Sequence, residues 1–221
     1  MANETTDPRT VLLKNVRLAF TDSLKDKKAT VEDGEPKHSC SIIVEKGKPQ
    51  SDANLAAIRA ALEAAGDKEW KKPDAWKEIT EDEPKRVCFR KGERFKNVEG
   101  VIYKGFEGNF GISASGPKGG KSRPKLLDRH KRSVEEKDIL DVFYGGTYAD
   151  VYVSFFGTTK GGRGIFASVE MIRSRQEGEA LGGGFNGSAD AMEDLPDDDA
   201  FDKPAAADKA PAGGADDDMF G

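Results

Sequence analysis

Residues 148–156 have the sequence YADVYVSFF, in which the side chains of two faces alternate strictly. One face carries Val151, Val153 and Phe155. The other face carries Tyr148, Tyr152, Ser154 and Phe156. Alternation with a period of two predicts a β-strand with one buried face. The glycine-rich sequence GTTKGGRG at 157–164 predicts a hairpin turn, and residues 165–173 then form the last strand.

Further strands are predicted at residues 10–20 (TVLLKNVRLAF), 38–45 (HSCSIIVE), 87–90, 100–103 and 106–115. Residues 52–65 (DANLAAIRAALEAA) predict one clear helix, with Asp52 as its N-cap and Gly66 as its end. A broken helical excursion is expected at 67–79, a short helical turn at 134–141, and loops at 21–37 and 116–124. Five or more strands with one intervening helix favour a mainly β fold with an α insertion, a small closed or partly closed barrel.

The composition narrows the class of protein. The 221 residues include 35 Lys and Arg against 40 Asp and Glu, for a net charge of -5. No stretch approaches the roughly 20 apolar residues of a membrane helix, and MANETTDPRT at the start does not predict a signal peptide. Two cysteines, Cys40 and Cys88, cannot form a disulfide framework, so a reducing, cytoplasmic setting is expected. These features exclude membrane proteins and secreted disulfide scaffolds.

The charge is divided unevenly along the chain. Residues 1–175 hold 33 basic and 27 acidic residues, whereas residues 176–221 hold 2 basic and 13 acidic ones. We therefore expect a basic domain at 1–175, a glycine-rich hinge at 176–189 and a disordered acidic tail at 190–221. A tail with acids before a terminal aromatic residue is typical of a docking peptide. It also suits a counter-charge for the basic domain, while a purely solubilising role is the alternative.

Residues 85–132 combine basic and aromatic side chains. They hold 14 Lys and Arg against 4 acids, with five aromatic rings interleaved. Lys and Arg attract phosphates irrespective of base sequence, and rings stack on unpaired bases. Because a duplex hides the faces of its bases, this combination predicts binding to single-stranded nucleic acid. The candidate residues are Phe89, Arg90, Lys91, Arg94, Phe95, Lys96, Tyr103, Lys104, Lys118, Lys121, Arg123, Lys125, Arg129, Tyr148 and Tyr152.

Two structural alternatives accompany this prediction. Phe106, Phe110 and Ile112 share one face of a strand at 106–115, so Phe89, Phe106 and Phe110 have an equal claim to be core residues. Phe95 and Tyr103 lie among charged residues and glycines and are the better stacking candidates. The basic loop at 118–132 has a simple solvated loop as its alternative.

Sequence patterns for catalysis and cofactors are weak. GPKGGKS at 116–122 has the wrong spacing for a phosphate-binding P-loop. The zinc-capable residues lack paired spacing; they are His38, Cys40, Cys88 and His130. Four acidic residues are clustered in the sequence and could hold the magnesium ion of a nuclease: Glu135, Glu136, Asp138 and Asp141. The basic residues beside them favour a solvated surface instead. The sequence therefore predicts no metal, no cofactor and no enzyme activity.

Three stretches together resemble a known family: DVFYGGTYADVYVSFF at 141–156, GRGIFASVEMIRSRQEGEALGGG at 162–184, and DDDMFG at 216–221. They are similar to the phage-encoded single-stranded DNA-binding proteins, T7-type replication proteins among them. The resemblance implies a five-stranded OB-fold barrel that coats single-stranded DNA in phage replication and recombination inside the infected bacterial cell. It also implies an acidic tail that competes with DNA and contacts replication and recombination proteins, through Asp216, Asp217, Asp218, Met219 and Phe220. The final Gly221 departs from the terminal Phe more familiar in that family.

The main prediction is thus a sequence-nonspecific single-stranded DNA-binding protein. The alternatives are a metal-dependent nuclease and an inhibitor whose acidic tail mimics DNA. A monomer and a homodimer both remain open.

Overall fold

The structure is a computed structural model that describes residues 7–29 and 34–181. The chain divides into a compact unit, Met1–Gly184, and a second unit, Phe185–Gly221. The predicted tail at 190–221 and most of the predicted hinge lie outside the described residues. Within the described ranges, no helix is long and apolar enough to cross a membrane.

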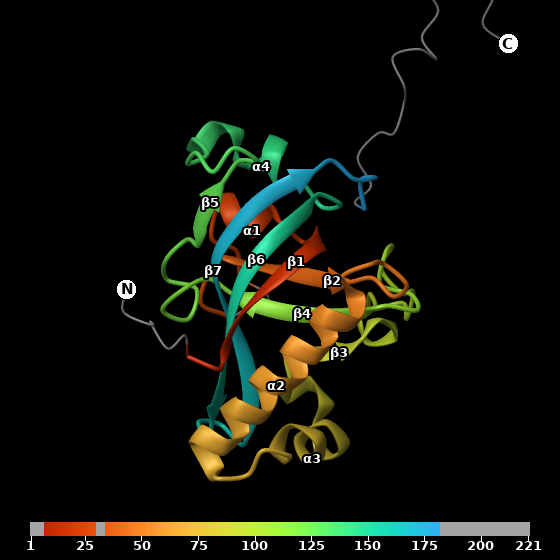
Figure 1. Cartoon of the computed structure of the whole chain (residues 1–221), viewed down its shortest axis with the longest axis vertical. Helices are drawn as coiled ribbons and strands as arrows, with labels where there is room; N and C mark the ends of the chain where they lie inside the picture. Colours follow the sequence, from red (N-terminus) through yellow and green to blue (C-terminus); the bar gives the residue numbers. More distant parts are fainter. Residues whose placement is uncertain (1–6, 30–33, 182–221) are drawn as a thin grey trace, which may run out of the picture. The chain divides into compact units, whose positions relative to one another are not determined.

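The described residues form seven strands and four α-helices (Figure 1). The strands are β1 (Thr10–Ala19), β2 (Ser39–Val44), β3 (Phe89–Lys91), β4 (Phe110–Ser115), β5 (Lys125–Leu127), β6 (Tyr148–Thr158) and β7 (Gly164–Gln176). The helices are α1 (Asp22–Lys25), α2 (Ser51–Trp70), α3 (Ala75–Asp82) and α4 (Ile139–Val142), with 3-10 turns at Pro84–Arg86, Gly92–Arg94 and Glu136–Asp138.

Five of these strands close into a barrel. Neighbouring strands pair in the order β4-β2-β1-β6-β7, and β7 then returns to pair in parallel with β4, through Ala114↔Ala167 and Ser115↔Ser168. The barrel strands in chain order are β1, β2, β4, β6 and β7, which we number 1 to 5. Around the barrel they follow the order 1-2-3-5-4-1, which is the order of an OB-fold barrel. The short strands β3 and β5 extend the sheet from β4 and β7. The predicted five-stranded barrel with an α insertion is therefore confirmed.

The alternation in β6 determines which side chains enter the core. Val151, Val153 and Phe155 are fully buried in the main hydrophobic cluster, while Tyr152 and Phe156 are exposed on the outer face. The hairpin to β7 pairs Phe156 with Phe166 near its turn. Local periodicity thus gave the correct inner and outer faces.

Helix α2 packs beside β1 and β6 (Figure 1) and is longer than the sequence predicts. It begins at Ser51, so Asp52 lies in its first turn, with Gln50 at the N-cap position. It continues through Gly66 and ends at Trp70, and the following Lys71 caps it with a left-handed backbone. Gly66 has a packing role instead, because a Cβ there would lie 2.6 Å from the Lys72 carbonyl oxygen.

A β-bulge in β1 is held by side chains from other elements. The pairing of β1 with β6 shifts register between Leu13 and Val16. Asn54 on α2 accepts a hydrogen bond from the Lys14 backbone N–H (3.0 Å) and donates one to the Lys14 carbonyl (2.8 Å). Asp150 accepts a bond from the Asn15 N–H (3.0 Å). The backbone groups freed by the bulge are therefore satisfied.

Two predicted strands differ from the structure. Residues 100–103 form only an isolated bridge, Lys96↔Ile102, and the strand predicted at 106–115 begins at Phe110. Phe106 therefore does not share a strand face with Phe110: it is buried in a separate cluster with Ala19 and Ile43. The glycines at 105 and 108 have positive φ angles, which favours turns over a strand in this stretch.

Residues 177–181, which the sequence assigns to the hinge, pack on the barrel; we call them the strap. The Leu181 N–H donates to the Gly145 carbonyl (2.8 Å), and Tyr144 Oη donates to the Gly178 carbonyl (2.8 Å). Lys104 pairs with Glu179 (2.6 Å), and the pKa of that carboxyl is lowered by the hydrogen bond and charge of the lysine. The strap extends the ordered domain past residue 175.

Candidate nucleic-acid interface

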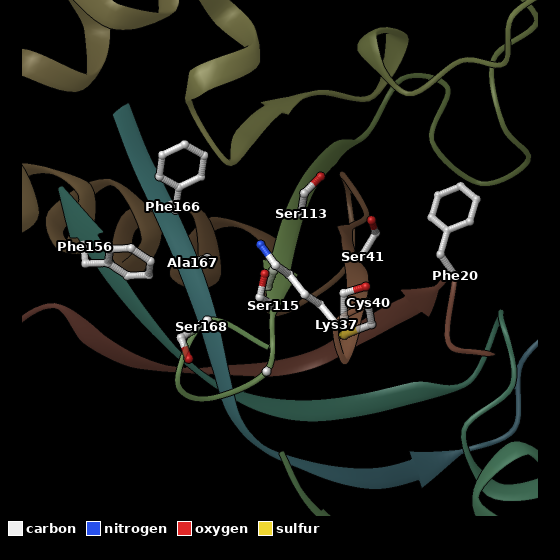
Figure 2. Close-up of a pocket in the computed structure, with 14 residues that line it drawn as sticks. Phe20, Lys37, Cys40, Ser41, Ser113, Ser115, Phe156, Phe166, Ala167 and Ser168 are labelled. Atoms are coloured by element: carbon white, nitrogen blue, oxygen red, sulfur yellow. The ribbon is translucent and has the colours of Figure 1, made fainter. Parts of the chain in front are cut away.

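An open groove of about 490 Å³ crosses the outer face of the barrel. Its floor is made where β2, β4 and β7 meet, and hydroxyl side chains dominate there (Figure 2). These side chains alternate with inward-facing apolar residues on the same strands. The floor serines are Ser39, Ser41, Ser113, Ser115 and Ser168.

Aromatic rings stand at the two ends of this groove. Figure 2 shows Phe20 on one side of the serine floor, and Phe156 and Phe166 on the other. Phe20 is 47% exposed and Phe156 is 38% exposed, and the Phe156 and Phe166 ring centroids are 6.3 Å apart. Exposed rings at both ends of an open groove are suited to stacking on unpaired bases.

Phe20 has an unusual backbone conformation at the end of β1. Its φ angle is 53°, a left-handed value that is unfavourable for a bulky residue. Its ring contacts Tyr103 edge-on, with centroids 4.9 Å apart, and stacks on Phe106 at 5.9 Å. Strain of this kind is commonly stored at functional sites. Here it directs an aromatic ring toward solvent at the groove end.

A column of rings continues from Phe20 beneath the surface. Phe106 stacks on Phe95 at 4.3 Å, and the Arg90 guanidinium lies 4.6 Å from the Phe95 ring centroid. Gly111 in β4 makes room for this column, because a Cβ there would overlap the Phe95 ring. The column supports Phe20 and Arg90 from below.

Positive side chains border the groove. Arg90 donates to Ser113 Oγ on the floor (2.7 Å), and burial lowers the pKa of its guanidinium. Lys37 extends into the groove (Figure 2). The loop carrying Lys118 and Lys121 lies beside Lys37, since the Gly120 carbonyl accepts from the His38 N–H (2.9 Å). These cations are placed to contact phosphates of a strand in the groove.

The structure places Phe89 in the core, which was the alternative stated for it, and corrects the stacking role expected of Phe95. Phe89 is 8% exposed and stacks on Phe110 in the main core, and Phe95 is 6% exposed within the buried column. Their ring faces are covered by protein, so no base can stack on them. Tyr103 is exposed, as expected of a stacking residue, and lies beside Phe20.

The other predicted residues are distributed over several surfaces. Lys104 and Arg123 are paired with carboxylates, Glu179 and Glu136 respectively. Tyr148 donates to Glu45 (2.9 Å), and burial raises its pKa. Lys91 is the last residue of β3, and Arg94 and Lys96 follow this strand; all three side chains are exposed. Outside the groove lining lie Lys125, Arg129 and Tyr152.

Sequence reasoning missed most of the groove itself. Phe20, Lys37 and Phe166 were not among the candidates, and Phe156 was only assigned to an outer face. The available signal was the repeated serine at alternate positions in SCS at 39–41 and SAS at 113–115. Small polar residues alternating with apolar ones on two strands indicate an outer face that is left open.

The metal-capable residues do not converge within the described ranges, where no three of His, Cys, Asp or Glu cluster as metal ligands. Cys40 and Cys88 are buried, which raises the pKa of each thiol to about 12. His38 Nδ1 lies 2.9 Å from the Ser23 carbonyl oxygen. In the acidic set, Glu136 pairs with Arg123 (2.7 Å).

The fold is an OB-fold barrel, and its groove lies over the second and third barrel strands, the face with which this fold binds oligonucleotides or oligosaccharides. The family model of the Enterobacter phage Enc34 ssDNA-binding protein matches residues 9–201. The chain belongs to this family of phage single-stranded DNA-binding proteins.

Individual relatives are more distant. Protein p50 of Acyrthosiphon pisum secondary endosymbiont phage 1 is 27% identical over 187 residues, which cover 84% of this chain and 93% of p50. The solved complex of the bacteriophage Enc34 single-stranded DNA-binding protein with ssDNA has a TM-score of 0.62 at 20% identity, covering 79% of this chain and 90% of that one. The single-stranded DNA-binding protein gp2.5 of bacteriophage T7 has a TM-score of 0.46 at 14% identity, covering 85% and 96%.

Proposed function

We propose that the groove binds single-stranded DNA without regard to sequence. The observation that carries the proposal is the arrangement of exposed Phe20 and Phe156 at opposite ends of a serine floor. Lys37 also lines the groove, and Arg90 donates a hydrogen bond to Ser113 of the floor. Stacking accepts every base because each has a π face, and cations contact phosphates common to all sequences. Serine hydroxyls donate or accept, so they suit any base edge or sugar.

The biological role that follows is to coat single-stranded DNA during phage replication and recombination, in the cytoplasm of the infected bacterial cell and without catalysis. Membership of the phage family supports this role, and so does the similar fold of the bacteriophage Enc34 protein, whose structure has been solved in complex with ssDNA. Stacked and coated bases are protected from pairing.

The acidic sequence at 190–221 supplies the second part of the proposal. Its tip, Asp216–Phe220, recruits replication and recombination proteins, and its carboxylates compete with DNA for the cations of the groove. The carboxylates of the tail and the cations of the groove have opposite charges, and salt screens their attraction, so competition between the tail and DNA should weaken as the salt concentration rises.

Fluorescence anisotropy tests both parts. Labelled oligo-dT is compared with a duplex of equal length over a salt series, for the full chain and for residues 1–189. We expect a strong preference for oligo-dT, a steep loss of affinity with salt, and tighter binding by the truncated chain. Equal affinity for duplex, or weaker binding after truncation, would contradict the proposal. An oligo-U of the same length distinguishes DNA from RNA preference.

Two further measurements address the alternatives. Incubation of labelled DNA with Mg²⁺ tests the nuclease, since cleavage that depends on Glu135 and Asp138 would replace the binding proposal. A chain lacking residues 182–221, which keeps β7 and the strap, would favour the inhibitor that mimics DNA if it bound no nucleic acid. Analytical ultracentrifugation of the free chain distinguishes a monomer from a homodimer.

A further inference from the structure

A second hollow lies on the outer face of the barrel, beyond the groove. It has a volume of about 290 Å³, and Tyr152 within it is 39% exposed. The register places Tyr152 between Leu12 on β1 and Met171 on β7, so its ring stands on an apolar base. The lining is completed by Leu127, Lys131, Asp150 and Arg173.

The strands β6 and β7 lead from the groove to this hollow. Phe156 and Phe166 pair at the groove end, and the outward pair Ser154↔Ser168 comes next. Ser168 belongs to the groove floor, and Tyr152↔Met171 is the following outward pair. With a strand rise of ~3.3 Å per residue, Tyr152 lies about 13 Å from Phe156 along β6. A strand leaving the groove at Phe156 therefore meets Tyr152 next.

The charge around Tyr152 suits phosphates. Asp150 is neutralised by two arginines, with Arg173 at 2.6 Å and Arg175 at 3.5 Å. Lys131 at the rim adds an exposed positive charge. The balance of these groups is positive, as a phosphate backbone requires.

Lys131 is held in place by its own loop. Asp128 accepts backbone hydrogen bonds from His130 (2.8 Å) and Arg132 (2.9 Å), and these bonds lower the pKa of its carboxyl. The Lys131 N–H donates to the Asp128 carbonyl (3.0 Å), and Lys131 has a φ of 66°. A braced loop loses little entropy when it binds a phosphate.

We propose that Tyr152, with Lys131 and Arg173, forms a second base-stacking site for the same DNA strand as it leaves the groove at the Phe156 end. This site rests on the proposed function of the groove. An acidic peptide with an aromatic residue has similar chemistry. The outward pairs that lead from the groove floor to Tyr152 favour DNA, although the register shifts at Glu170, which accepts a hydrogen bond from Ser168 (2.7 Å).

The test compares two labelled oligo-dT lengths by anisotropy: one of about 5 nucleotides, which the groove accommodates, and one of about 15 nucleotides, which extends past it. Tyr152→Ala is expected to weaken binding of the long oligonucleotide roughly fivefold to a hundredfold, leaving the short one unchanged. Tyr152→Phe, which keeps the ring, should retain the affinity of the unmodified chain for both lengths.

Lys131→Ala gives an independent measurement, because this side chain is exposed and its removal spares the core. It should reduce the salt slope of long-oligonucleotide binding by about 0.7, the value for one phosphate contact on a single strand. Lys77→Ala on α3 makes the same charge change on a helix away from this hollow and is the matched control, with no change in slope expected.

Several results would overturn the second site. They are an equal loss for both oligonucleotides, no loss for either, or a Tyr152→Ala variant that loses binding only to the synthetic peptide DDDMFG. Failure of the groove proposal has a different signature, because the unmodified chain would then not bind the short oligonucleotide at all.

Discussion

Replacing Phe20 by glycine and by alanine should reverse the usual order of stability of these two residues. A left-handed backbone, here with a φ of 53°, costs an L residue ~1–2 kcal/mol. Glycine avoids this cost but loses about 0.5–1 kcal/mol through the greater freedom of its unfolded chain. Both variants lose the same ring contacts with Tyr103 and Phe106. The Phe20→Gly protein should therefore be more stable than Phe20→Ala by about 0.5–1 kcal/mol.

The same pair of variants tests the groove. Both remove the ring that is most exposed there, so both should bind oligo-dT more weakly, by ~1–3 kcal/mol or roughly fivefold to a hundredfold. Phe20→Tyr keeps an aromatic ring and should bind nearly as tightly as the unmodified chain. Stability thus reports on the backbone at residue 20, while affinity reports on its side chain.

Urea unfolding followed by circular dichroism measures the first quantity, and anisotropy with labelled oligo-dT measures the second. A difference of that size corresponds to a shift in Tm of ~1–4 °C for a chain of this length. An alanine variant as stable as the glycine variant would refute the argument from strain. Unchanged affinity in both variants would remove Phe20 from the interface.

Two adjacent residues in β6 should respond differently to replacement by alanine. Phe156→Ala should weaken oligo-dT binding and leave the stability nearly unchanged, whereas Phe155→Ala removes a core ring and should cost ~3–5 kcal/mol of stability. Equal melting temperatures of the two variants would contradict this prediction. Asn54→Leu leaves the bulge backbone unsatisfied and should cost ~1–3 kcal/mol in urea unfolding, without changing the affinity of the folded protein. Cys40 and Cys88 should resist iodoacetamide at neutral pH until the chain is unfolded, and rapid native labelling would disprove their burial. Because folding raises the pKa of both thiols from 9.0 to about 12, their contribution to stability is full below pH 9.0 and is lost as the pH rises toward 12.

The barrel was predictable where the decisive information is local. Alternation in β6 and the glycine-rich turn after it specify a hairpin and its inner face without reference to the rest of the chain. The end of α2 was not predictable in this way. Gly66 has the appearance of a helix terminator, but it is needed because the chain after the helix returns close to it. That return depends on tertiary packing.

For the groove too, the sequence predicted what depends on composition and missed what depends on tertiary packing. A basic, aromatic stretch pointed to the family of single-stranded DNA-binding proteins to which the chain belongs, because charge and ring content are properties of composition. Which rings are exposed depends on distant partners: Phe106 is covered by Phe20 and Ile43, and Phe95 lies beneath Arg90. The serine floor likewise appears only when β2 and β4 are known to be neighbours.

The seam between β4 and β7 has a consequence for how the protein is made. Ala114 and Ala167 are far apart in the chain, and parallel pairing across such a separation forms slowly. Ser115 and Ser168 lie on this seam and on the floor of the groove. A newly synthesised chain therefore lacks the groove that we propose as the binding surface until β7 has emerged from the ribosome and docked. If DNA binds across this seam as we propose, it should also slow unfolding, because it would hold together the last part of the barrel to form.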